Sequence, residues 1–194
     1  MKTVLASKNA HKLQEISKIV NKFGLELVLQ SDLGIDIDVE ETGTTFEENS
    51  MLKAQAVMEA TGMIAIADDS GLVVDALNGE PGIYSARYGG EQCKNDVERY
   101  EYLLKQMEHI PDGERGAKFV CVITLVLPDR TAIVAHGECC GEILRAPCGE
   151  HGFGYDPVFY VPEEGKTMAE MPEERKNEIS HRARALEELS RMMG

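Results

Sequence analysis

The sequence predicts an α/β fold, because segments with the apolar spacing of helices alternate along the chain with short apolar runs typical of strands. Of the 194 residues, 43% are hydrophobic and 28% are charged, which is typical of a globular protein with a buried core. The sequence contains neither an internal repeat nor a low-complexity linker. We therefore expect one domain that spans residues 1–194.

The first half of the chain is expected to form three strands and two helices. In order, we expect a strand at 3–6, a helix at 9–23, a strand at 25–29, an edge strand at 35–40 and a helix at 45–61. Gly24 and Gly62 directly follow the two helical segments, where glycine commonly ends a helix. Thr45 and Glu48 match a capping box, and alternating apolar and acidic residues predict the edge strand.

The second half is expected to be richer in strands. In order, we expect strands at 63–67 and 72–77, a glycine-rich loop at 78–90, a helix at 95–107, a hairpin of 118–127 and 131–144, a strand at 158–161 and a helical tail from 173. The first of these strands runs straight into the sequence Asp68-Asp69-Ser70-Gly71. Pro128 and Arg130 flank the expected hairpin turn, and Ser180 is a candidate N-cap that breaks the tail.

The formal net charge of −14 argues against binding to a nucleic-acid backbone or to an anionic membrane. An anionic substrate would need local lysines, helix N-termini and a divalent metal to offset the repulsion. The five cysteines show no metal-ligand spacing and are expected to be reduced thiols, with one of Cys139 and Cys140 buried in a strand. The short apolar stretch at the start and the lack of a membrane-spanning apolar run predict a cytoplasmic protein.

Residues 7–12 lie between an expected buried strand and the start of an expected helix. The N–H groups at such a junction lie at the positive end of the helix dipole, where phosphate binds. The candidate phosphate contacts are Ser7, Lys8, Asn9, Ala10, His11 and Lys12. The glycines of a Walker A loop are absent, and helix capping by Ser7 or Asn9 is the alternative.

Three acidic positions are candidates for metal binding. Asp68 and Asp69 end the apolar run 64–67, and two adjacent carboxylates repel each other unless a cation or a proton lies between them. Mg²⁺ is bound in proteins by one or two carboxylates together with substrate phosphates. Glu41 precedes a helix on which Asn49 and Lys53 share a face, which predicts a lysine that faces a cleft. An acidic turn and a lysine that extends to solvent are the alternatives.

Two segments near the C-terminus are candidates for contact with a flat ring. Phe153 and Tyr155 are separated by one glycine and could stack on a base, while Asp156 could accept a hydrogen bond from a ring N–H. Lys176 and the sequence Ser180-His181-Arg182 add basic side chains. Inward packing of the two aromatic rings and solvated salt bridges of the basic residues are the alternatives.

In this order and at these spacings, the segments resemble the inosine triphosphate pyrophosphatase family over almost the whole chain. The matching segments are 7–12, Glu41 with Thr45, Phe46, Asn49 and Lys53, then 67–72, 81–87, 153–157, and Lys176 with 180–182. The resemblance implies a two-lobed α/β fold, with a long twisted mixed sheet flanked by helices and an active-site cleft between the lobes. It also implies a homodimer that depends on Mg²⁺ and hydrolyses ITP, dITP and XTP to the monophosphate and pyrophosphate. Such a protein removes aberrant purine nucleotides from the nucleotide pool.

The resemblance also implies roles for individual residues. Asp69 is implied in catalysis and metal binding and Glu41 as the second metal ligand, with Glu40 as the alternative ligand and Asp68 as the alternative base. The residues implied to hold phosphates and sugar are Ser7, Lys8, Asn9, Ala10, His11, Lys12, Lys53 and Ser70. The residues implied to surround the base are Phe153, Gly154, Tyr155, Asp156, Lys176, His181 and Arg182. A pyrophosphatase for modified pyrimidine nucleotides and a catalytically silent nucleotide-binding protein are the rival interpretations.

Overall fold

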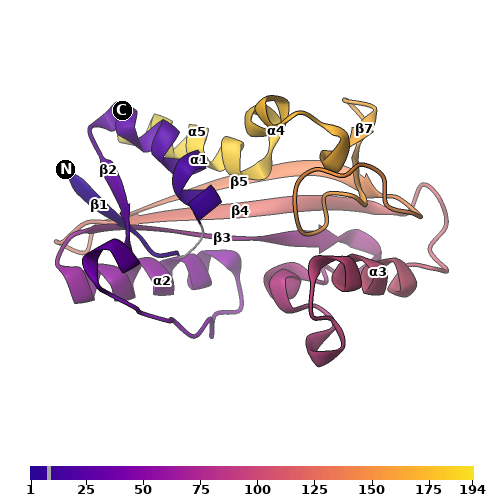
Figure 1. The fold of residues 1–194 in the computed structure, drawn as a ribbon, viewed down its shortest axis with the longest axis horizontal. Helices are drawn as coiled ribbons and strands as arrows, with labels where there is room; N and C mark the ends of the chain where they lie inside the picture. The colour runs from indigo at the N-terminus through magenta and orange to yellow at the C-terminus, as the bar shows by residue number, and fades with distance from the viewer. Residues whose placement is uncertain (8–9) are drawn as a thin grey trace. The chain divides into compact units, whose positions relative to one another are not determined.

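A seven-stranded mixed sheet with flanking helices organises the computed structural model, which describes residues 1–7 and 10–194 except for the side chains of Ala10, His11 and Glu15 (Figure 1). The strand order is β2-β1-β3-β4-β5-β6-β7. The strands are β1 (Lys2–Leu5), β2 (Glu26–Leu29), β3 (Ile64–Val74), β4 (Gly116–Val126), β5 (Ala132–Ile143), β6 (Phe159–Val161) and β7 (Lys166–Thr167). β1 pairs parallel with β2 and β3, whereas β6 pairs antiparallel with β5 and β7, so the predicted mixed sheet is confirmed.

The helices begin and end close to the predicted positions, because local capping signals mark their ends. The helices are α1 (Ala10–Val20), α2 (Phe46–Thr61), α3 (Asp96–Gln106), α4 (Glu173–Ile179) and α5 (His181–Met193). Before α2, the Thr45 side chain accepts a hydrogen bond from the Glu48 amide at 3.1 Å. After it, Gly62 has a φ of 66°, a left-handed conformation that glycine adopts without steric cost. Ser180 lies in extended backbone between α4 and α5, as predicted.

The chain divides into two compact units, each built from separate segments. Unit 1 consists of Met1–Asp69, Cys121–Gly137 and Arg182–Gly194, and unit 2 consists of Ser70–Val120 and Glu138–His181. The prediction of a single domain and that of a cleft between two lobes stay predictions. No helix in the described part of the chain is both long and apolar enough to cross a membrane.

In unit 1, apolar side chains cover both faces of the sheet. Leu5, Ile64 and Ile66 belong to a buried cluster that includes residues of α1 and α5. Ala65 and Ala67 belong to a second cluster that includes residues of α2. Since successive strand residues point to opposite faces, α1 and α5 cover one face of this part of the sheet and α2 covers the other (Figure 1).

Unit 2 has a core of its own, in which Leu72 and Val74 of β3 pack with Leu103 of α3 and with Phe119 and Phe159. The rings of Phe119 and Phe159 lie 4.4 Å apart between centroids. Of the adjacent cysteines of β5, Cys139 is buried and Cys140 is exposed, which confirms that one of the two is buried.

Two predicted elements are wrong. Residues 35–40 form no strand, although the burial of their side chains does alternate. An alternating pattern shows which side chains face the protein, but a strand also needs a neighbouring strand to pair with. The second error concerns residues 63–77, where two strands were expected on either side of Asp68-Asp69-Ser70-Gly71. β3 instead runs without a break from Ile64 to Val74, so the two aspartates do not end a strand.

Candidate active site

Asp68 and Asp69 lie within β3 and point to opposite faces of the sheet. Asp68 continues the face of Ile64 and Ile66, and Asp69 continues the face of Ala65 and Ala67. The pairing of β1 with β3 ends at Leu5 opposite Ile66, so both aspartates lie just beyond the carboxyl end of a parallel neighbour. Ligands commonly bind at this edge of a parallel sheet, although β3 itself continues past it.

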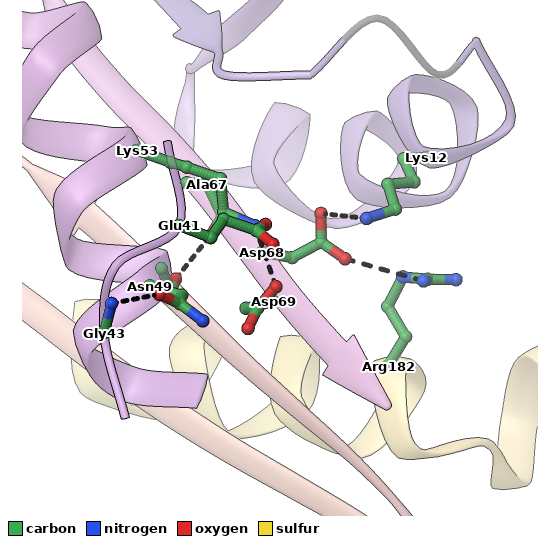
Figure 2. Close-up of polar contacts among 10 residues, drawn as sticks. Lys12, Glu41, Gly43, Asn49, Lys53, Ala67, Asp68, Asp69 and Arg182 are labelled. Atoms are coloured by element: carbon green, nitrogen blue, oxygen red, sulfur yellow. Dashed lines mark hydrogen bonds and ion pairs between the residues drawn. The ribbon is translucent and has the colours of Figure 1, made fainter. Parts of the chain in front are cut away.

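On the α2 face, Asp69 belongs to a cluster of three charged side chains. The Lys53 ammonium lies 2.9 Å from Asp69 Oδ1 and 2.8 Å from Glu41 Oε1 (Figure 2). Glu41 and Asp69 are therefore brought together from separate stretches of chain by one lysine. Lys53 contacts Glu41 and not the exposed Glu40, which favours Glu41 where the sequence left both glutamates open.

The charges of this cluster shift the pKa values of its members. Burial raises the pKa of Asp69, and Glu41 and Asp68 raise it too, so that the pKa lies above its ordinary value despite the opposing effect of Lys53. Burial lowers the pKa of Lys53, but the Asp69 and Glu41 carboxylates outweigh that effect and raise it above its ordinary value. Lys53 therefore stays charged, whereas Asp69 is protonated more readily than an ordinary aspartate.

On the opposite face, Asp68 contacts two cations. The Lys12 ammonium of α1 lies 2.9 Å from Asp68 Oδ1, and a guanidinium nitrogen of Arg182 in α5 lies 3.5 Å from Oδ2 (Figure 2). Burial alone would raise the pKa of Asp68, but Lys12 and Arg182 hold it well below its ordinary value. Asp68 is therefore expected to be ionised. It contacts both Lys12, a predicted phosphate contact, and Arg182, a predicted base contact.

In unit 2, buried Asp156 and partly buried Lys176 form an ion pair. The Lys176 ammonium contacts Asp156 Oδ2, and the same oxygen accepts a hydrogen bond from the Phe153 amide at 3.0 Å. Lys176 also lies over the Phe153 ring, 4.8 Å from its centroid. Phe153 is nevertheless 54% exposed, so solvent reaches this residue.

The loop that carries Phe153 is held by hydrogen bonds to its backbone and to Tyr155. The Gly154 amide donates to Asp96 Oδ2 at 2.8 Å, and the buried Tyr155 hydroxyl donates to the Ser85 carbonyl at 2.7 Å. The Ser85 hydroxyl in turn accepts from the Leu72 amide at 2.8 Å. Tyr155 is therefore a core residue, and of the two aromatics only Phe153 presents an exposed ring. The sequence could not reveal Ser85 and Asp96 as supports, because they lie far from this loop along the chain.

The remaining predicted contacts are distributed over several elements. Ser7 lies between β1 and α1, Ala10 and His11 lie in the first turn of α1, and Ser70 lies in β3. The His181 ring stacks on Phe119 with centroids 4.9 Å apart. Lys8 and Asn9, also predicted to hold phosphate, lie outside the described residues.

The chain is thus an α/β protein with a mixed sheet. Its charged cluster, in which Lys53 joins Glu41 and Asp69, lies just beyond the carboxyl end of β1. A family model described as the Ham1 family matches residues 3–192, and the chain belongs to this family. The resemblance to the inosine triphosphate pyrophosphatase family is thereby confirmed.

Similar proteins and structures cover nearly the whole chain. A dITP/XTP pyrophosphatase from Clostridium perfringens is 52% identical over 194 residues, which covers 97% of this chain and 95% of that protein. A dITP/XTP pyrophosphatase from Shigella flexneri is 51% identical over 187 residues, covering 95% and 94%. The structure of the Staphylococcus aureus Ham1 protein matches with a TM-score of 0.92 at 47% identity, covering 100% of this chain and 98% of that chain.

Proposed function

We propose that this chain hydrolyses the noncanonical purine nucleoside triphosphates dITP, XTP and ITP to the monophosphate and pyrophosphate. Membership of the Ham1 family supports the reaction, as do relatives of about half identical sequence that carry the name dITP/XTP pyrophosphatase. The observation that carries the proposal is the convergence of Glu41 and Asp69 on Lys53. Two carboxylates beside a partly buried ammonium would supply ligands for a metal and a positive charge for phosphate.

The donor set of the cluster fits a magnesium ion. Asp69 Oδ1 contacts Lys53, whereas its buried Oδ2 has no hydrogen-bond partner among residues 1–7 and 10–194. Carboxylate oxygens are the ligands that Mg²⁺ prefers, and substrate phosphates complete its coordination. Among the described residues, no group of three or more His, Cys, Asp or Glu side chains could hold a metal ion. Bound Mg²⁺ would offset phosphate charge, held by Glu41 and Asp69.

Asp69 is the better candidate for the catalytic base. Its buried Oδ2 has no hydrogen-bond partner in the described residues and could take up a proton, whereas each Asp68 oxygen contacts a cation. In the proposed step, Asp69 takes a proton from water while the water oxygen bonds to the α-phosphorus. The bond from the α-phosphorus to the bridging oxygen breaks, and pyrophosphate leaves with the electron pair. Lys12 and Lys53 stabilise the negative charge that develops on the phosphate oxygens.

Base selection is proposed to depend on hydrogen-bond polarity. Hypoxanthine and xanthine present a 6-oxo acceptor and an N1–H donor, and adenine reverses both. His181 and Arg182 are the proposed donors to the 6-oxo group, and Phe153 is the proposed stacking surface. A site built for one polarity rejects the other by about 10⁴-fold or more, because its buried polar groups are left unpaired.

A pyrophosphate-release assay tests the proposal directly. We expect release from dITP, XTP and ITP that requires Mg²⁺, with far lower rates for ATP and for modified pyrimidine nucleotides. Equal rates for ATP and ITP would show that the base assignment is wrong, and preference for pyrimidines would favour the first rival function. Tight binding of ITP without turnover would favour the silent nucleotide-binding protein. A homodimer, a single domain and a cytoplasmic location complete the proposal, and sedimentation analysis tests the first of these.

A further inference from the structure

Asn49 is a buried polar residue in the first turn of α2 for which the proposed reaction gives no role. Its exposed fraction is 0%, and it lies four residues before Lys53, so the two side chains share one face of the helix. Its Oδ1 accepts a hydrogen bond from the Gly43 amide at 2.9 Å (Figure 2). Asn49 therefore connects the helix that carries Lys53 to the loop that carries Glu41.

Gly43 lies unusually close to this helix. A Cβ atom added at Gly43 would lie 2.6 Å from Asn49 Oδ1 and 2.7 Å from Glu48 Cβ, closer than real Cβ atoms approach other atoms. Any side chain at this position would push the loop away from α2. Glu41 lies only two residues before Gly43, and two residues span at most about 7 Å. The contact between Gly43 and Asn49 thus limits how far Glu41 can move from Lys53.

The other half of the Asn49 side chain indicates why asparagine is used. The Gly43 amide is a donor, so the end of the Asn49 side chain that faces it must be the oxygen, Oδ1. The other end is the nitrogen, Nδ2, and this buried atom has no hydrogen-bond partner in the described part of the chain. A buried donor without a partner destabilises a protein, and leucine would fill a similar volume without that cost. The acceptor oxygen for Gly43 is therefore the feature that distinguishes asparagine from an apolar residue here.

We propose that Asn49 is a positioning residue that sets the place of the Glu41 carboxylate through the Gly43 amide. Its consequence for catalysis rests on the proposed role of Glu41 as a metal ligand. Residues that orient a metal ligand commonly change metal affinity by about 10-fold to 100-fold when they are removed. Loss of Asn49 should therefore weaken Mg²⁺ binding, while the contacts of the nucleotide base are left intact.

Four variants test this chain of contacts. Asn49→Ala removes the acceptor, Gly43→Ala forces the loop away, and Asn49→Asp keeps an acceptor oxygen of the same reach. Ser50→Ala is the matched control, because Ser50 is an equally buried neighbour whose hydroxyl donates to the Ala67 carbonyl at 3.2 Å. Melting temperatures by circular dichroism identify any variant that is simply less folded.

The first readout is structural and independent of activity. In crystal structures of Asn49→Ala and Gly43→Ala, the Glu41 carboxylate should leave Lys53, which it contacts at 2.8 Å in the native chain. In Asn49→Asp and Ser50→Ala the contact should persist. If Glu41 keeps its contact with Lys53 in Asn49→Ala, or loses it equally in Ser50→Ala, the positioning role is overturned.

The second readout is the Mg²⁺ concentration that gives half-maximal pyrophosphate release. We expect it to rise about 10-fold or more in Asn49→Ala and Gly43→Ala, to lie nearer the native value in Asn49→Asp, and to be unchanged in Ser50→Ala. The KM for ITP at saturating Mg²⁺ should stay within about twofold of the native value. A changed KM with an unchanged Mg²⁺ midpoint would refute the proposal. If the native chain releases no pyrophosphate, the proposed function fails, and the crystal structures still decide the role of Asn49.

Discussion

The charged cluster of unit 1 and the Phe153 loop of unit 2 are held in place by different forces. In unit 1, four ion pairs hold the charged side chains in place. Asp68 pairs with Lys12 and Arg182, and Lys53 pairs with Asp69 and Glu41. In unit 2, one ion pair is supported by hydrogen bonds to backbone groups of the Phe153 loop. Ion pairs suit the phosphate contacts proposed for unit 1, and backbone hydrogen bonds suit the fixed stacking surface proposed for unit 2. Substitutions in the two regions should therefore fail in different ways.

The largest effect is expected from Asp69→Asn. This substitution removes the proposed base and a proposed metal ligand but keeps the shape of the side chain, so kcat should fall by about 10²-fold to 10⁴-fold. The melting temperature should change little, because ionised Asp69 is itself disfavoured by burial and by neighbouring carboxylates. Single-turnover measurements and circular dichroism check the two parts. A variant with near-native turnover would show that Asp69 is not the base.

Asp68→Asn should act mainly on stability. This substitution removes the buried negative charge that faces both Lys12 and Arg182, and breaking a buried ion pair typically costs about 3–5 kcal/mol in the free energy of unfolding. Urea denaturation measures the loss. Asp112→Asn in unit 2 is the control, because the exposed pair of Asp112 with Arg145 should contribute less than about 1 kcal/mol. Equal losses in both variants would contradict the contrast between the units.

Ser85→Ala should weaken unit 2 without touching a charge. The Leu72 amide then loses its acceptor in a buried place, which costs about 1–3 kcal/mol. The turn that carries the Ser85 carbonyl also loses the hydroxyl contacts to Leu72 and Gly82, so the Phe153 loop, which this carbonyl holds through Tyr155, becomes less fixed. We therefore expect a higher KM for ITP with little change in kcat. Steady-state kinetics and denaturation measure both effects. A fall in kcat at constant KM would instead place Ser85 near the chemical step.

The smallest effect is expected from Tyr88→Phe and appears only in alkali. Burial and the nearby Glu80 raise the pKa of Tyr88 to about 12, above the ordinary tyrosine value. A group whose pKa is raised in the folded state contributes stability below its unfolded pKa, and this stability is lost as pH rises toward the folded value. Native protein should therefore lose stability between about pH 10 and pH 12 more steeply than the variant. Parallel pH profiles of the melting temperature would exclude this contribution.

The sequence predicted best what neighbouring residues decide. The ends of α2 follow from Thr45, Glu48 and Gly62, which act within one turn of the helix. The continuous β3 could not be predicted, because Asp68-Asp69-Ser70-Gly71 has the composition of a turn, and its strand conformation depends on β4 beside it.

The partners within the site were harder to predict than its members. Asp68 and Asp69 were identified as site residues, but their separation onto two faces follows only once they are known to lie within a strand. Glu41 contacts Lys53 from a segment with no regular secondary structure. The spacing of apolar residues does not predict the path of such a segment. Asn49 stood out by its spacing from Lys53, yet its partner Gly43 depends on the path of that same segment.

The boundaries between the two units fall inside the motifs, after Asp69 and after His181. The polypeptide consequently passes from one unit to the other four times, at 69–70, 120–121, 137–138 and 181–182. Neither unit corresponds to an uninterrupted stretch of the gene, so neither can be inherited, duplicated or exchanged as a module.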